Sequence, residues 1–182
     1  SAATAVTVNA KPTVSISASP YTKLLPGLST TLTATVNPAG TYTYTWLKNG
    51  AAVNVSGSNS ALNVSLDQLG SYTMMVTNNS VPPCSNTSAA VVIADSVSAK
   101  LFVYPNPTDG DFQVRYYTTV AGAHTVSVYD ARGAMVFRKA YTVSNPYQQM
   151  DVNISKHGSG VYQVVLHDKN GKKLATRQVV IQ

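Results

Sequence analysis

The chain has 182 residues and a net charge of +6, hydrophobic residues make up 44% of it, and it contains no glutamate. That apolar share is too high for a disordered chain, and no apolar stretch approaches the roughly 18 residues of a membrane-spanning helix, so neither disorder nor a membrane span is expected. The basic residues are spread singly through the chain rather than along one stripe, which argues against nucleic-acid binding.

The chain opens with SAATAVTVNA, which carries neither the charged segment nor the apolar segment of a secretory signal. This stretch resembles the middle of a longer polypeptide, so we expect the chain to be a fragment. Threonine, serine, valine, asparagine and tyrosine dominate the composition, and good helix formers are scarce. Such a composition favours β-strands.

Alternating apolar and polar residues predict short strands through the first half of the chain. The pattern is clear in TLTATV (31–36), TYTYTWLKNG (41–50), ALNVSL (61–66) and SYTMMV (71–76). The pair Asn49-Gly50 predicts a hairpin turn after the second of these. Short strands at this spacing, separated by turn residues, predict a β-sandwich. We expect the sandwich to end near AAVVIADSVSAK (89–100), whose small polar residues predict a linker.

The alternation restarts after this linker. Further strands are predicted in LFVY (101–104), DFQVRYY (111–117), HTVSVYD (124–130), AMVFRKAY (134–141), QQMDVN (148–153), GVYQVVLHD (160–168) and KKLATRQVVIQ (172–182). The sequence therefore predicts an all-β protein of two tandem antiparallel β-sandwich domains with immunoglobulin-like or Greek-key topology, spanning residues 1–95 and 96–182.

Residues 11–94 resemble an immunoglobulin-like domain. Trp46 stands where such domains carry a buried tryptophan, and DQLGSYTMMV resembles the tyrosine corner, with Tyr72 two residues before the usual second cysteine. Met74 replaces that cysteine, and the opposing strand offers Leu32 or Ala34 to face it. We expect Trp46 in the core rather than on a surface that stacks against sugars.

The segment VYPNPTDGDFQV (103–114) predicts a stiff corner at the start of a strand. Pro105 and Pro107 lack backbone donors and cannot both join a central ladder, and they favour extended conformations at Tyr104 and Asn106. The Thr-Asp-Gly sequence that follows supplies turn chemistry. From physical chemistry alone, this is a structural corner.

Three motifs in this half nevertheless occur together in a specific order. YPNPTDGDF is followed by VSVYDARGAMV and then by SGVYQVVLHDKNGKKLATRQVVIQ. With this order and spacing, residues 97–182 resemble the type A C-terminal sorting domain of the type IX secretion system. The resemblance implies a non-catalytic antiparallel sandwich at the end of exported proteins of the Bacteroidota.

The resemblance also implies which residues the export machinery reads. Carried over position by position, the recognition residues are Pro105, Asn106, Pro107, Gly110, Gly160, Tyr162, Lys172, Lys173 and Arg177. If the final strand lies at a sheet edge, its backbone could also accept a strand from a receptor, with nearby basic residues steering an acidic partner. Without the resemblance, Lys172 and Lys173 would be interpreted as a solvated turn.

In that family the domain is recognised at the outer membrane after the cargo has reached the periplasm. A surface protease of the sortase type often removes it and can join the cargo to an anionic lipopolysaccharide. The region cut would be Ala94, Asp95, Ser96, Val97, Ser98, Ala99 and Lys100. We therefore expect a monomer that is secreted or held at the cell surface, with the first domain as a spacer.

Candidate catalytic and metal-binding groups are few. The histidines lack metal-ligand spacing and lie near predicted strand ends or turns, where we expect them to be solvated: His124, His157 and His167. Asp109 and Asp111 flank Gly110 as in a calcium loop, but the further acids of such a loop are missing. The single cysteine, Cys84, cannot form an internal disulfide and is expected to be a loop thiol. We expect no enzymatic activity, no cofactor and no metal.

A second function remains open from the sequence. The tyrosine-rich stretches TYTYTW and VRYYTT could present an aromatic face to a polysaccharide, with Tyr117 as an outward residue. The chain would then be a surface adhesin or a carbohydrate-binding module.

Overall fold

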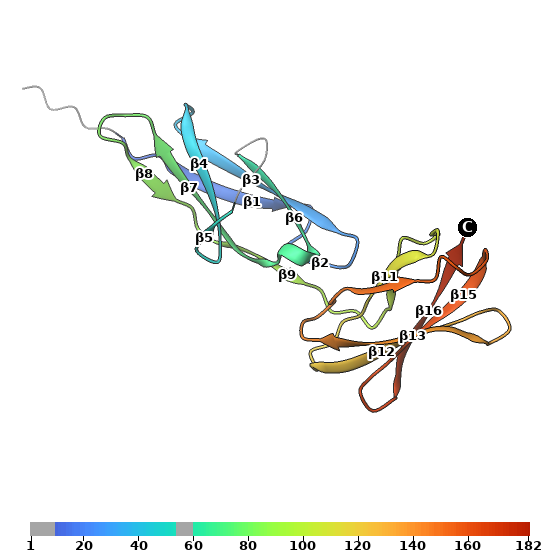
Figure 1. Cartoon of the computed structure of the whole chain (residues 1–182). Coiled ribbons are helices and arrows are strands. Elements are labelled where there is room, and N and C mark those ends of the chain that lie inside the picture. The colour runs from blue at the N-terminus through green and yellow to red at the C-terminus, as the bar shows by residue number, and fades with distance from the viewer. Residues whose placement is uncertain (1–9, 54–59) are drawn as a thin grey trace, which may run out of the picture. The chain divides into compact units, whose positions relative to one another are not determined.

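The computed structural model describes residues 10–53 and 60–182. The chain divides into two compact units, Ser1–Ser96 and Val97–Gln182, and strands dominate both (Figure 1). The all-β class expected from the sequence is therefore confirmed. Most of the opening stretch discussed above, residues 1–9, lies outside the described residues.

The first unit is a sandwich of two sheets. One sheet has the order β1-β3-β6, and the other has the order β2-β9-β7-β4-β5, with β8 also pairing with β7. All these pairs are antiparallel except β2 and β9, which run parallel. The strands are β1 (Thr13–Ser19), β2 (Lys23–Leu24), β3 (Ser29–Asn37), β4 (Tyr42–Lys48), β5 (Ala51–Ala52), β6 (Ala61–Ser65), β7 (Gly70–Asn78), β8 (Ser85–Thr87) and β9 (Val91–Asp95).

The core of this unit forms where the sequence predicts it. Trp46 on β4 is the direct cross-strand partner of Met74 on β7, and both side chains are buried with Leu32 from the opposite sheet. The Tyr72 hydroxyl donates a hydrogen bond to the Gln68 carbonyl, which forms the predicted tyrosine corner. Trp46 is therefore a core residue, and a thioether fills the volume that a disulfide occupies in many immunoglobulin domains.

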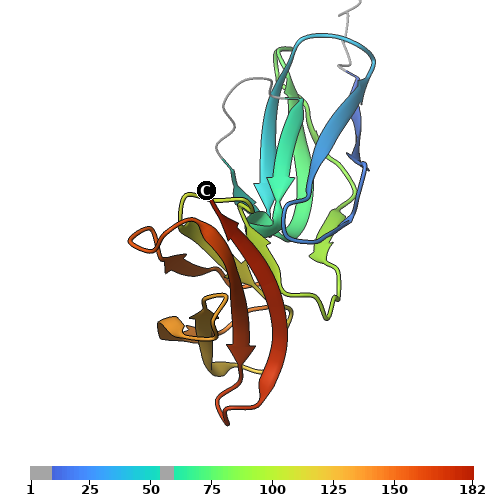
Figure 2. The same ribbon diagram turned by 90° about the vertical axis from the view of Figure 1, so that its right-hand side faces the viewer.

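The second unit is also a sandwich, of a three-stranded and a four-stranded sheet. Their orders are β10-β11-β14 and β13-β12-β15-β16, so β16 lies at an edge, beside β15 (Figure 2). The strands are β10 (Phe102–Tyr104), β11 (Asp111–Arg115), β12 (Gly122–Tyr129), β13 (Met135–Val143), β14 (Met150–Asn153), β15 (Gly160–His167) and β16 (Lys173–Ile181).

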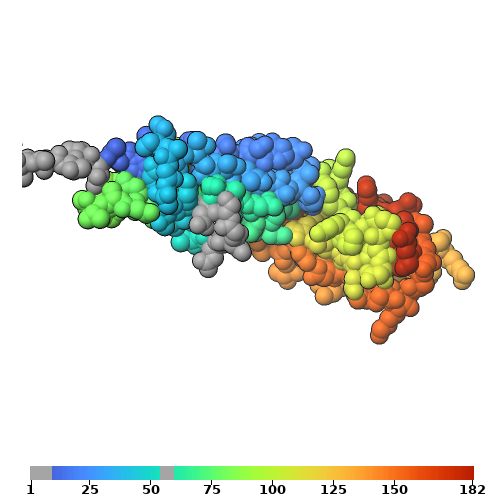
Figure 3. Space-filling view, turned by 90° about the horizontal axis from the view of Figure 1, so that it is seen from above, coloured from blue at the N-terminus to red at the C-terminus, as the bar shows by residue number. Residues whose placement is uncertain are grey.

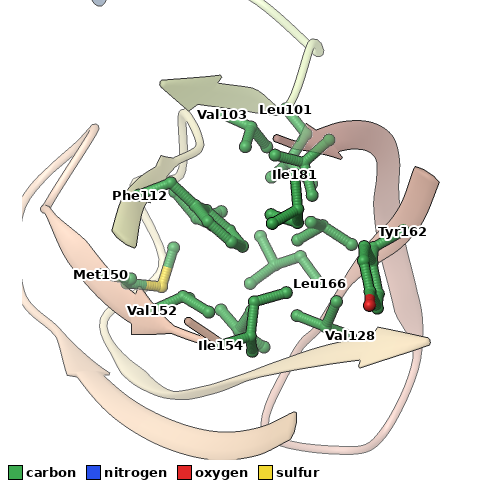
Figure 4. Packing of buried hydrophobic residues seen from close by; sticks show 14 of the residues in the cluster. Leu101, Val103, Phe112, Val128, Met150, Val152, Ile154, Tyr162, Leu166 and Ile181 are labelled. Atoms are coloured by element: carbon green, nitrogen blue, oxygen red, sulfur yellow. The ribbon is translucent and has the colours of Figure 1, made fainter. Parts of the chain in front are cut away.

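Apolar side chains from the two sheets meet between them. Phe112, Met150 and Val152 come from the smaller sheet, and residues such as Leu166 and Ile181 come from the larger one (Figure 4). Because successive side chains of a strand point to opposite faces, the residues between these buried ones face outward. That alternation places polar residues of β11 and β14 on the outer face of the smaller sheet.

The structure corrects three expectations. The predicted linker 89–100 begins with a strand, because Val91–Asp95 forms β9. His124 is only 3% exposed rather than solvated, and its Nδ1 lies 3.1 Å from the Gly122 carbonyl oxygen. The strand predicted at 111–117 ends at Arg115.

Arg115, the last residue of that strand, is buried among hydrogen-bond partners. Its side chain is 7% exposed and donates hydrogen bonds to Gln113, Gln149 and the Tyr147 carbonyl. A buried guanidinium needs such partners. Tyr147 and Gln149 come from the loop that leads into β14, whereas Gln113 lies on β11 itself. Tyr117, the candidate sugar-binding residue, packs edge-on against the buried Tyr147 ring at 5.5 Å.

Removal of the Met74 side chain tests the core of the first unit. Because Met74 is 0% exposed, Met74→Ala should lower the free energy of unfolding by about 2–5 kcal/mol. Urea unfolding followed by the fluorescence of Trp46, the single tryptophan, measures this unit selectively. The control Val92→Ala, at a position that is 60% exposed, should change the value by less than about 0.5 kcal/mol. Equal losses in the two variants would contradict the assignment.

Candidate functional site

The Pro-Asn-Pro corner lies against the open edge of β16. The peptide bonds before Pro105 and Pro107 are cis, and all three residues of the motif are exposed. Asn106 Nδ2 donates to the Gln178 carbonyl at 3.0 Å, and the Val180 N–H donates to Asn106 Oδ1 at 3.0 Å. Its carboxamide thus pairs with β16 as the backbone of a neighbouring strand would.

Thr108 continues this pairing with its own backbone. Its N–H donates to the Val180 carbonyl at 3.0 Å, and the Gln182 N–H donates to the Thr108 carbonyl at 3.0 Å, around a parallel bridge between Thr108 and Ile181. The Thr108 hydroxyl is turned inward, where it donates to the Asp111 carbonyl at 2.5 Å. Residues 106–108, which we call the edge clamp, therefore close the edge of β16 along 178–182.

The space-filling view agrees with this arrangement. The final residues, in dark red, reach the surface of the second unit beside the yellow-green segment that carries the motif (Figure 3). Sequence reasoning proposed Asn106 for recognition but did not identify Thr108. Thr108 is only 6% exposed, and a threonine in a Thr-Asp-Gly turn gives no signal of that burial.

The clamp leaves only a short part of the β16 edge open. Backbone groups of Gln178 and Val180 point to the open side, and alternation along an antiparallel strand places those of Thr176 on the same side. Within the part of the chain that the structure describes, no partner is found for the Thr176 backbone on that side. Strand addition along the whole final strand, which the sequence suggested, is therefore blocked over 178–182.

Basic residues surround the part that stays open. Lys172, Lys173 and Arg177 are all exposed. Arg177 pairs with Val164, whose side chain is buried, so the guanidinium lies on the core-facing side of an edge strand. Inward-pointing charges on edge strands oppose indiscriminate strand pairing.

The turn before β16 fixes the backbone of Lys172, the first of these basic residues. Asp168 Oδ1 accepts hydrogen bonds from the Asn170 N–H at 2.8 Å and from the Lys172 N–H at 2.9 Å. The hydrogen bond from the Lys172 backbone lowers the pKa of the Asp168 carboxyl below its usual value. Asp168 is therefore ionised at neutral pH and fixes the start of the basic segment.

Gly110 has a packing reason to be glycine. Its φ is +112°, and a Cβ built on it would lie 2.4 Å from the Ser155 Cα and 2.6 Å from the Ser155 nitrogen. Its carbonyl accepts a hydrogen bond from the Ile154 N–H at 2.9 Å. The two flanking carboxylates are also engaged, because Asp109 accepts from the Asp111 N–H at 3.2 Å and Asp111 accepts from Asn153.

Tyr162 lies inside the sandwich rather than on its surface. It is 8% exposed, and its hydroxyl donates to the Gly158 carbonyl at 2.6 Å. This repeats the corner of the first unit, where Tyr72 bonds the carbonyl four residues before it. Gly160 makes no close approach, since a Cβ there would meet only the Tyr162 ring at 3.7 Å.

The proposed cleavage region falls into two parts. Ala94 and Asp95 belong to β9 and pair with Lys23 and Leu24 of β2. The Ser96 N–H donates to the Leu24 carbonyl at 2.9 Å. Residues 97–100 have no regular structure, and Val97 is 74% exposed. Because a protease needs an unpaired, extended segment, the accessible part of the region is 97–100.

Comparison with known families gives one match, within the second unit. Residues 102–182 match the family model of the secretion system C-terminal sorting domain. This match confirms the resemblance that the motifs predicted and covers just under half of the chain. None of the curated proteins matches the chain. The described residues contain no helix long and apolar enough to cross a membrane.

The similarity to solved structures is distant. The three N-terminal domains of the Hoc capsid protein of bacteriophage RB49 share 20% identity with a TM-score of 0.42, over 94% of this chain and 59% of that one. SGBP-B of the Bacteroides ovatus mixed-linkage glucan utilization locus, solved in complex with a mixed-linkage heptasaccharide, shares 18% identity with a TM-score of 0.32, over 97% of this chain and 48% of that one. Fibronectin(III)-like modules of Clostridium thermocellum CbhA share 11% identity with a TM-score of 0.36, over 93% of each chain.

Substitution of Gly110 tests the close approach to Ser155. Gly110→Ala should destabilise the second unit more than Gly133→Ala, which has a φ of +83° but no atom within 4 Å of its Cβ position. The Gly133→Ala control measures only the cost, about 1–2 kcal/mol, of placing a side chain at positive φ. In Gly110→Ala the clash with Ser155 adds to that cost. Thermal unfolding of both variants measures the difference. Equal melting temperatures would show that the contact with Ser155 does not matter.

Substitution of Asn106 tests the edge clamp. Asn106→Ala removes one hydrogen bond to Gln178 and one to Val180, each of which contributes about 0.5–1.5 kcal/mol. Amide hydrogen exchange at Val180 should therefore accelerate roughly tenfold, while exchange at Val164 on the adjacent strand stays unchanged. Unchanged exchange at Val180 would exclude the carboxamide as its partner.

Proposed function

We propose that the second unit is a non-catalytic sorting signal that directs a larger protein through the type IX machinery of the outer membrane. The observation that carries this proposal is the match of residues 102–182 to the sorting-domain family. In this proposal residues 11–94 form a spacer between the signal and the cargo upstream. The exported protein passes through the periplasm and ends in the medium or at the cell surface.

The predicted recognition residues divide into two groups by their surroundings. Pro105 and Pro107 are exposed, as are the basic residues Lys172, Lys173 and Arg177, so we propose that these contact the machinery. Three of the other predicted residues act through the fold, whereas no role is proposed for Gly160, which is exposed and makes no close approach. Asn106 closes the β16 edge, Gly110 permits the approach of Ser155, and Tyr162 fixes a corner of the sandwich.

The open part of the β16 edge is the proposed contact with the receptor. An acidic receptor segment can pair its backbone with Thr176 and place its side chains beside the flanking basic residues. Because the clamp blocks 178–182, the contact is short and its affinity depends on charge more than on backbone pairing. Removal of the sorting unit by a surface protease would fall within residues 97–100, and the released cargo could then be joined to an anionic lipopolysaccharide.

An export assay tests the charge dependence. A fluorescent reporter with a signal peptide is fused before the whole chain and expressed in a host that carries the export system. The variant Lys173→Ser/Arg177→Ser should reduce reporter in the medium and on the surface several-fold, with accumulation in the periplasm. The matched control Arg132→Ser/Lys156→Ser removes two exposed charges of the same unit far from β16 in the sequence and should leave export unchanged.

Both double variants must unfold at the parent temperature, and an established cargo must be exported by the same cells. Equal export of the two variants would eliminate the basic segment as a contact. Periplasmic retention of the parent fusion itself would overturn the sorting proposal.

A further inference from the structure

A groove of about 510 Å³ opens on the second unit, lined by residues of β10, β11, β13 and β14. Tyr104, Gln113 and Asp151 are direct neighbours across β10, β11 and β14. They alternate along their strands with the core residues Val103 and Val152, so they lie on the outer face of the smaller sheet. The volume is within the roughly 300–1,000 Å³ of small-ligand sites.

The polar residues of the groove are held in fixed positions by their neighbours. Gln113 Oε1 accepts from Arg115 at 2.7 Å, which leaves its NH₂ group as the available donor. Asp151 accepts from Gln149 at 2.6 Å through one carboxylate oxygen. Asp111 likewise accepts from Asn153 at 2.5 Å through one oxygen. The second oxygen of each carboxylate is then available as an acceptor, already oriented before any ligand binds.

The third residue type in the groove is apolar and aromatic. Tyr104 is 55% exposed, a high value for a tyrosine, and Pro105 and the half-buried Phe137 also line the groove. An exposed aromatic face beside a proline offers a flat apolar platform to a ligand.

One cation borders the same groove. Lys139 lies with its Nζ 4.8 Å from the centre of the Tyr141 ring, and the Tyr141 hydroxyl donates to the Asp151 carbonyl. Burial, with the Asp151 charge as a second cause, raises the pKa of Tyr141 to about 12. Tyr141 therefore stays protonated at neutral pH and keeps this hydrogen bond, which supports the Lys139 position.

This combination of groups limits the ligand class. Two carboxylates against a single lysine disfavour anionic ligands. Fixed acceptors and donors around an aromatic platform suit a molecule with many hydroxyl groups and one apolar C–H face. A pyranose ring has both, because its hydroxyls donate to carboxylates and accept from amides while its C–H face packs on an aromatic ring.

We propose that this groove binds a neutral saccharide, with Tyr104 as the stacking platform and with Asp111, Gln113 and Asp151 as the hydrogen-bonding groups. The site differs from the aromatic face that the sequence suggested, since Tyr117 packs on Tyr147. The proposal does not depend on export, and the sorting function could fail without affecting it.

Calorimetric titration of the whole chain tests the site. The probes are the neutral hexaoses of cellulose, xylan, mannan and laminarin, with oligogalacturonate as an acidic probe and hexalysine as a basic one. At least one neutral hexaose should bind, and oligogalacturonate should not. Tyr104→Ala should weaken that binding at least about tenfold.

The matched control is Tyr21→Ala, which removes another tyrosine that is 45% exposed but belongs to the first unit; its affinity should equal that of the parent. Asp151→Asn, which keeps the shape of the side chain and removes its charge, should also weaken binding. This second variant tests the site even if Tyr104→Ala misfolds. The side-chain amide signals of Gln113 and Asn153 should shift in NMR spectra on titration.

Three results would overturn the proposal. They are no binding of any neutral hexaose at millimolar concentration, binding that is unchanged in Tyr104→Ala, and binding of hexalysine alone. The last result would indicate that the groove accepts a basic peptide instead.

Discussion

The pairing between the edge clamp and β16 is the interaction on which the second unit depends. A strand at a sheet edge exposes a row of unpaired backbone groups, and proteins normally protect such an edge. Here the protection comes from a corner 72 to 74 residues earlier in the chain, where the Asn106 carboxamide takes the place of a strand. The two prolines beside Asn106 restrict its backbone and offer no donors of their own. The Pro-Asn-Pro motif and β16 therefore form one structural element. A change in either of them affects the surface that the other presents.

The two units share a tyrosine corner, which has a different role in each. Each has a strand that begins with glycine and has a buried tyrosine as its third residue, and each tyrosine bonds the carbonyl four residues before it. In the first unit the corner stabilises a sandwich closed around Trp46 and Met74. In the second, the same corner begins β15, the neighbour of the clamped β16, and so supports the surface proposed for recognition. Shared local chemistry therefore does not imply shared function.

Local patterns allowed prediction of most strands, whereas long-range contacts could not be predicted. Alternation places Tyr72, Met74 and Val76 on one buried face, as observed. No strand was predicted at Thr13–Ser19, although Val14, Ile16 and Ala18 alternate there. Arg115 and His124 are polar, and their burial depends on partners that only the folded chain brings together. The role of Asn106 was missed for the same reason, because nothing in a Pro-Asn-Pro sequence identifies a strand more than 70 residues away.

The position of β9 decides what a cut between the two units would leave intact. Val91–Asp95 is an integral strand of the first unit, held by β7 on one side and by the parallel β2 on the other. A cut before Ser96 would remove backbone partners from both neighbours and expose Ile93, which is 1% exposed in the intact fold. A cut within 97–100 would spare every strand and leave a short tail with a new terminal carboxylate outside the folded body. The first unit could then be coupled through that carboxylate to another molecule without any loss of its own stability.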